Sequence, residues 1–176
     1  MLLLKLLVKC PYSIYNFKTF YSFQKKKKKF RFNKEKYRLQ TTKNFGKSGI
    51  DTSIVYLNTF CNLDNKTIEY NFIRYFSTGE VFYSLPYLSQ PTEKQFNDLS
   101  YGGWSMFAVD EDGIIKCEKY VRFLFTFEYL WSKVEGDSIV TYKSKLTRWP
   151  WGVVEKGKWV ATEYKVKLLP VLNRNW

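Results

Sequence analysis

Short turn-forming clusters recur between runs of strand-forming residues from residue 49 onward, and this spacing limits the possible folds more than any other feature. Residues 77–79, 110–113 and 135–137 each separate two runs rich in Val, Ile, Tyr and Phe. Two such runs around a tight turn containing glycine predict a β-hairpin, because glycine tolerates the positive φ that the turn requires. The sequence therefore predicts three successive hairpins.

The predicted strands are joined mostly in chain order by tight turns. Pro86 and Pro91 exclude a central strand from the longer connection over residues 86–97. About seven or eight strands in this order are typical of an antiparallel up-and-down meander, and such a sheet usually closes to remove its edges. We expect an all-β fold that closes into a barrel or half-barrel, with strands at residues 54–58, 67–76, 80–85, 104–109, 114–121, 123–133, 138–145 and 159–169.

The formal charge of the chain is concentrated at its N-terminus. Residues 1–50 hold 14 of the 29 Lys and Arg but only one of the 16 acids, a net charge of +13; residues 51–176 hold 15 of each and are neutral. We therefore divide the chain into a basic, disordered tail over residues 1–44 and a β-barrel domain over residues 45–176. The tail should be dispensable for folding, and the neutral domain is a poor candidate for nucleic-acid binding.

The basic tail has several possible roles. Its charge run, interleaved with aromatic residues, can bind single-stranded nucleic acid through phosphates and stacking, or lie on an anionic membrane. The alternatives are a solvated tail without a partner and a misplaced start codon. Residues 1–8 are apolar but too short to span a bilayer, and Leu7, three residues before Cys10, resembles a bacterial lipoprotein signal that makes Cys10 a lipidation candidate. The basic run of the tail consists of Lys25, Lys26, Lys27, Lys28, Lys29 and Arg31.

The sequence contains little that supports catalysis. There is no histidine, which removes the commonest general base and the commonest metal ligand. The three cysteines form no CxxC pair, so a zinc site is not supported. Cys61 and Cys117 either pair in an oxidising compartment or are two buried thiols. We therefore expect no enzymatic activity, no cofactor and no metal.

A family resemblance rests on short motifs between residues 50 and 159. They are Val55-Tyr56, the run from Arg74 to Val81, and Tyr101-Gly102-Gly103-Trp104 with its Gly-x-Trp element. This stretch resembles the small lipocalin-like (calycin-type) β-barrel proteins of Bacteroidetes, many of them envelope or secreted proteins. The resemblance implies a lipocalin-like barrel in the cell envelope or outside the cell; the location is cytoplasmic if the N-terminal run is not a targeting signal.

The tryptophans admit two interpretations. Trp104, Trp131 and Trp159 either fill the barrel core or line an apolar cavity, since barrels of about eight strands can just hold one small ligand. We predict a non-enzymatic binding or structural protein of the envelope that holds a small apolar ligand; the alternative is an interaction module whose tail binds nucleic acid or an anionic membrane. The candidate ligand-binding residues are Trp104, Trp131, Trp159, Tyr75 and Tyr120.

Overall fold

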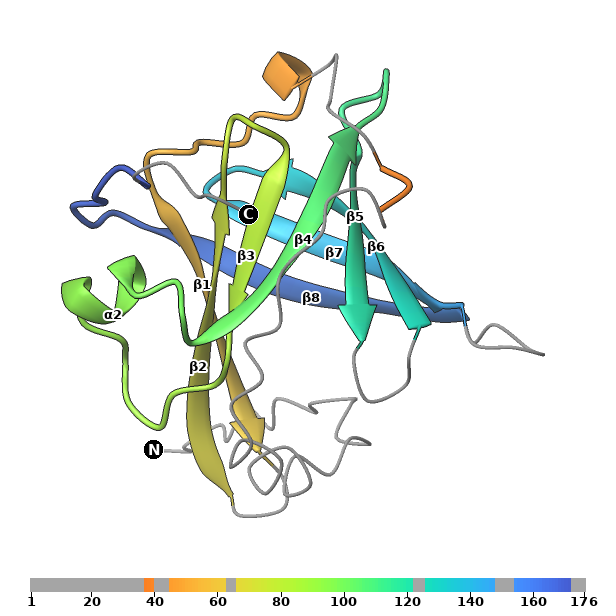
Figure 1. The fold of residues 1–176 in the computed structure, drawn as a ribbon. Coiled ribbons are helices and arrows are strands. Elements are labelled where there is room, and N and C mark those ends of the chain that lie inside the picture. The colour runs from red at the N-terminus through yellow and green to blue at the C-terminus, as the bar shows by residue number, and fades with distance from the viewer. Residues whose placement is uncertain (1–36, 40–44, 63–65, 122–125, 148–153, 172–176) are drawn as a thin grey trace, which may run out of the picture.

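The part of the chain described by the computed structural model, residues 37–39, 45–62, 66–121, 126–147 and 154–171, forms a closed antiparallel β-barrel (Figure 1). Eight strands in these residues follow one another round the barrel in chain order, and the last pairs with the first. The predicted all-β meander is confirmed, in its closed form. The strands are β1 (Val55–Asn62), β2 (Thr67–Tyr75), β3 (Glu80–Ser84), β4 (Gly102–Val109), β5 (Ile115–Val121), β6 (Thr126–Glu135), β7 (Ser138–Leu146) and β8 (Val154–Tyr164).

The three predicted hairpins are present, and each turn contains a glycine with positive φ. The angles are 84° at Gly79, 76° at Gly113 and 62° at Gly136, a region that side chains with a Cβ rarely adopt. These turns connect β2 to β3, β4 to β5, and β6 to β7. Turn chemistry thus sets the register of six of the eight described strands.

Two elements differ from the prediction. The connection between β3 and β4 contains a short helix, α2 (Glu93–Asn97), which a capping box at Thr92 and Gln95 begins and the buried Phe96 holds against the barrel. Its five residues are too few for helical periodicity to show in the sequence. The last strand, β8, runs from Val154 to Tyr164 and ends before the predicted residue 169, because the chain beyond it packs against the outside of the barrel.

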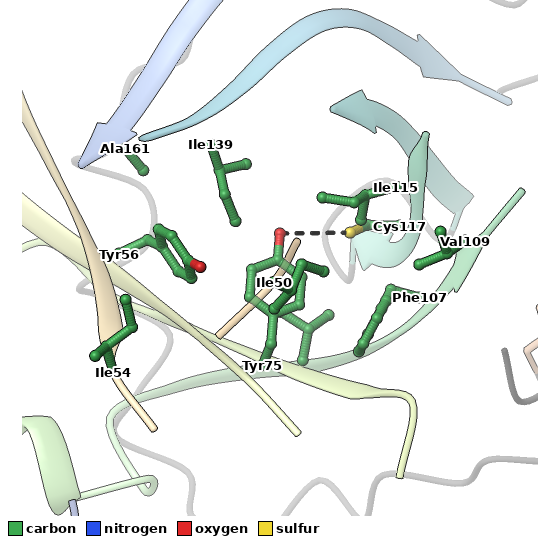
Figure 2. Close-up of a cluster of buried hydrophobic side chains, with 11 residues drawn as sticks. Ile50, Ile54, Tyr56, Tyr75, Phe107, Val109, Ile115, Cys117, Ile139 and Ala161 are labelled. Atoms are coloured by element: carbon green, nitrogen blue, oxygen red, sulfur yellow. Dashed lines mark hydrogen bonds between the residues drawn. The ribbon is translucent and has the colours of Figure 1, made fainter. Parts of the chain in front are cut away.

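The barrel interior contains a closely packed apolar cluster (Figure 2). Its members come from seven of the eight strands and from the segment before β1, which is possible only on the enclosed face. The Tyr75 ring lies edge-on to Phe107, with ring centroids 5.0 Å apart, and edge-on to Tyr56 at 5.9 Å. The cluster comprises Ile50, Ile54, Tyr56, Tyr75, Val81, Phe107, Val109, Ile115, Cys117, Ile139 and Ala161.

A second apolar cluster lies outside the barrel, beneath α2 and the chain that follows β8. It is built around Val55, Phe72, Phe82 and Phe96. The buried Arg74 of β2 holds the chain that follows β8 against this cluster, because its guanidinium donates a hydrogen bond of 2.7 Å to the carbonyl oxygen of Leu169. The outer faces of β1, β2 and β3 around Val55, Phe72 and Phe82 are therefore covered by the protein's own chain.

Three residues of the predicted tail are part of the barrel's packing. The Glu118 side chain, fully buried on the outer face of β5, accepts hydrogen bonds from the backbone N–H groups of Arg38 (2.6 Å) and Leu39 (2.9 Å) and from the Tyr129 hydroxyl (2.9 Å). The Tyr37 ring packs on Met106 and lies edge-on to Phe127, at 5.5 Å. The boundary predicted at residue 44 thus assigns residues 37–39, which contact the barrel, to the tail.

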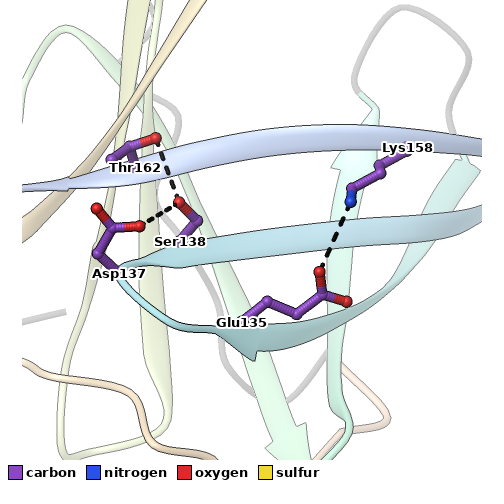
Figure 3. Close-up of polar contacts among 5 residues, drawn as sticks. All are labelled: Glu135, Asp137, Ser138, Lys158 and Thr162. Carbon is purple, nitrogen blue, oxygen red and sulfur yellow. Dashed lines mark hydrogen bonds and ion pairs between the residues drawn. The ribbon is translucent and has the colours of Figure 1, made fainter.

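Polar contacts join β8 to the β6–β7 hairpin (Figure 3). The Ser138 hydroxyl donates to Asp137 Oδ1 at 2.9 Å and lies 3.3 Å from Thr162 Oγ1. Glu135 and Lys158 form an ion pair of 3.7 Å, with both side chains more than half exposed. An exposed pair of this kind contributes only about 0–1 kcal/mol, so the backbone ladder between β7 and β8 holds these two strands together.

Candidate functional site

One end of the barrel is plugged by the segment before β1, next to the 3₁₀ turn η3 (Phe45–Lys47), which is orange at the top of Figure 1. A Cβ placed on Gly113, in the β4–β5 turn, would lie 2.6 Å from the carbonyl oxygen of Lys47. A Cβ placed on Gly49 would lie 3.6 Å from the Val134 side chain at the end of β6, in ordinary van der Waals contact. Ile50 and Ile54 continue from this segment into the interior cluster. These contacts fill this end of the barrel with the segment before β1.

The opposite end of the interior is lined by a different kind of residue. The connections there join β1 to β2, β3 to β4, β5 to β6, and β7 to β8, and those between β3 and β4 and between β7 and β8 are longer than the turns at the plugged end. The strand register places five residues close together on the inner face. Tyr83 pairs with Gly103, Lys119 pairs with Glu128, and Ser105 pairs with Val81 of the interior cluster. We call the set Tyr83, Gly103, Ser105, Lys119 and Glu128 the mouth.

Gly103 leaves open space on the inner face of β4. It faces inward because its partner Tyr83 packs against the interior cluster and because Phe107, four residues on, belongs to that cluster. A Cβ added to Gly103 would meet no atom of the described residues within 4 Å, and Gly103 is itself exposed. The neighbouring Gly102, on the outer face, is the opposite case, because a Cβ there would collide with the Phe82 ring and the Tyr83 carbonyl. A glycine within a strand often marks a bulge, a tight bend, or the close approach of a ligand or another backbone.

Lys119 extends across this open space. Its Nζ lies 5.2 Å from the centroid of the Tyr83 ring, two strands away, so the side chain crosses the inner face of β4. Its Nζ is also 3.9 Å from Glu128 Oε2. The side chains of Lys119 and Glu128 are 41% and 27% exposed, although both face the interior. Among the described residues, these two side chains of the mouth are therefore accessible to solvent.

Ser105 brings a buried hydroxyl to the mouth. The residue is only 1% exposed, and within the structure described its Oγ has no hydrogen-bond partner. Leaving a buried hydroxyl unpaired costs about 1–3 kcal/mol. Its partner Val81 and its strand neighbour Phe107 both belong to the interior cluster, so the hydroxyl is directed into the barrel.

A buried thiol forms the floor between the mouth and the apolar end. Cys117 Sγ lies 4.0 Å from the Tyr75 hydroxyl and also interacts with the Tyr83 hydroxyl. Burial raises the pKa of the Cys117 thiol to about 11 and the pKa of Tyr83 well above its usual value. All three groups are therefore neutral at pH 7. Cys117 is not paired with Cys61, which is free and exposed.

The five ligand-binding residues predicted from the sequence do not lie together. Tyr75 is fully buried within the interior cluster, and Trp159 faces inward, opposite Thr141 of β7. Trp104, Trp131 and Tyr120 lie on the outer face, where Trp104 packs against Phe82 and Trp131 is flanked by two lysines. Aromatic type alone does not show which face of a strand a residue occupies. Alternation along β4 places Ser105 and Gly103 on the same inner face as Phe107.

Several predicted features lie outside the described residues. These are the lipidation candidate Cys10 and the basic run of Lys25, Lys26, Lys27, Lys28, Lys29 and Arg31. Within the described ranges, no helix has the length and apolar character needed to cross a membrane. The same ranges contain no group of three His, Cys, Asp or Glu side chains placed to hold a metal ion.

A shallow surface depression of about 420 Å³ lies beside α2. It is lined by Glu93, Lys94, Asn97, Asp98 and Leu169. The Asn97 side chain is engaged with the backbone of Leu169 and Lys167, so it fastens the chain that follows β8. This depression therefore belongs to the outer packing layer, and the mouth is the stronger candidate site.

Comparison of the chain with protein-family models, with curated proteins and with solved structures finds no match. The site must therefore be interpreted from its own chemistry.

Proposed function

We propose that this protein is a non-enzymatic binding barrel of the lipocalin-like type, which takes a small molecule with an apolar body into its mouth. The observation that carries the proposal is the open space on the inner face of Gly103. Deeper in the barrel, Tyr56, Tyr75 and Phe107 fill the interior, so a ligand would enter only the half nearest the open end. A location in the cell envelope or outside the cell belongs to the same proposal.

A side chain that fills the mouth should weaken the binding of an apolar probe. N-phenyl-1-naphthylamine, a neutral apolar fluorophore, is a suitable probe because its emission rises on leaving water. We expect Gly103→Leu to weaken its binding by at least tenfold, because the new side chain occupies the open space. Gly46→Leu is the matched control, since a Cβ at Gly46 also meets nothing within 4 Å but lies in η3, at the plugged end.

Fluorescence titration of the three proteins decides the matter. Unchanged binding by Gly46→Leu together with lost binding by Gly103→Leu supports the mouth as the site. Equal binding by all three proteins, or no binding by the natural sequence, would refute the proposed function.

A further inference from the structure

We infer that the mouth selects small organic anions, with Lys119 and Ser105 binding a carboxylate or sulfonate group while the apolar body of the ligand occupies the space at Gly103. This inference rests on the proposed function and adds the chemical class of the ligand. Two separate observations support it. The Lys119 ammonium lies 3.9 Å from Glu128 Oε2, and the buried Ser105 hydroxyl has no hydrogen-bond partner among the described residues.

The Lys119 ammonium is only loosely held by protein groups. Its 3.9 Å separation from Glu128 Oε2 is much longer than the roughly 2.7–2.9 Å of a charge-assisted hydrogen bond. Its other recorded contact, with the face of the Tyr83 ring, uses no lone-pair acceptor. An ammonium has three N–H donors, so Lys119 can donate to an incoming anion without giving up a strong hydrogen bond.

The strand register relates Ser105 to Lys119. The pairs Met106–Glu118 and Phe107–Cys117 place Ser105 opposite Lys119 when the β4–β5 ladder is extended by one residue. Because the Lys119 chain crosses β4 toward Tyr83, it covers the Ser105 hydroxyl from the mouth side. A ligand that draws the ammonium outward would uncover this hydroxyl, which can then donate to the same anionic group.

Two acids of the inner face, Glu69 and Glu128, bear on this preference. Glu69, also directed inward, is 6% exposed and already accepts a 2.7 Å hydrogen bond from the Asn62 side-chain amide. Glu128 competes with a ligand for Lys119. Removal of the Glu128 charge should therefore strengthen the binding of an anion, whereas it would weaken the binding of a cation.

A matched pair of probes separates the anionic group from the apolar body. The compound 1-anilinonaphthalene-8-sulfonate has the ring system of N-phenyl-1-naphthylamine plus one sulfonate. We expect the natural protein to bind the sulfonate probe about tenfold more tightly than the neutral one. Lys119→Met keeps an unbranched chain and should remove this preference, with less than about a twofold change for the neutral probe. Glu128→Gln should tighten binding of the sulfonate probe by about threefold.

Ser105→Ala gives a second readout that a purely structural role would not produce. It should weaken binding of the sulfonate probe by several fold. In the free protein it should keep or raise the thermal midpoint, by up to about 2–4 °C, because it removes an unpaired buried hydroxyl. A serine that served the fold would instead lower the midpoint when replaced.

The outcomes separate this inference from the proposed function. Equal affinity for the two probes, a preference that survives in Lys119→Met, or weaker sulfonate binding by Glu128→Gln would overturn the anion selectivity while leaving the binding barrel in place. If neither probe binds, or if Gly103→Leu binds both normally, the proposed function fails and this inference fails with it.

Discussion

Replacing Phe107 with alanine is expected to lower the free energy of unfolding by about 3–5 kcal/mol. Phe107 has no exposed surface and packs edge-on against Tyr75 inside the barrel. Truncation therefore loses the transfer energy of a buried aromatic ring and leaves a cavity in a closely packed interior.

Trp131→Ala is the matched test for the outer face. Trp131 is half-buried, and its recorded contacts include Lys143 Nζ at 4.4 Å and Lys116 Nζ at 5.4 Å from the ring centroid. Exposed cation–π contacts are worth about 0.5–1 kcal/mol each, so we expect a cost below about 2 kcal/mol. Urea unfolding of both variants measures the difference. A cost for Trp131→Ala equal to that for Phe107→Ala would contradict the assignment of inner and outer faces.

Two N-terminal deletions are expected to differ sharply in stability. Removal of residues 1–36 should change the free energy of unfolding by less than about 0.5 kcal/mol, the range of changes that leave the packing of a protein intact. Removal of residues 1–44 should lower it by about 2 kcal/mol. The longer deletion eliminates two hydrogen bonds to the Glu118 carboxylate, each worth about 1.5–3 kcal/mol, and releases the ordering cost of residues 37–39, which offsets part of the loss.

Glu118→Gln controls for the cause of this difference. In the chain that begins at residue 37, it should reproduce part of the loss, because an amide carries no negative charge to accept from the two N–H groups. In the chain that begins at residue 45 those donors are gone, and the same substitution should cost less. Equal stability of the two deletions would show that residues 37–39 contribute nothing to the fold and that the boundary at residue 44 is adequate.

The fold could be predicted from the sequence because local signals agree along the chain. Glycines at the turns, such as Gly79 and Gly136, separate runs of strand-forming residues, and each hairpin follows from its own few residues. The pairing of β1 with β8 is a contact between distant segments. The expectation of closure therefore came from the general cost of unpaired edges.

The candidate site was less predictable because it depends on which way each residue faces. Trp104 and Gly103 are adjacent in the sequence yet lie on opposite faces of β4. The contact of Lys119 with Tyr83 joins strands that are not neighbours in the sheet. The docking of residues 37–39 was hidden for a related reason, since Glu118 acts through backbone N–H groups that have no sequence signature.

The central claim is that the barrel has a filled apolar end and a ligand-binding mouth, and a chemical-shift titration tests it most directly. The amide resonances of the ¹⁵N-labelled protein are followed as 1-anilinonaphthalene-8-sulfonate is added. The account predicts the largest shifts at residues 83, 103, 105, 119 and 128, with Ile50 and Val134 at the plugged end unchanged. Shifts centred on residues 93–98 beside α2, or on the outer face around Trp131, with the mouth unaffected would contradict it.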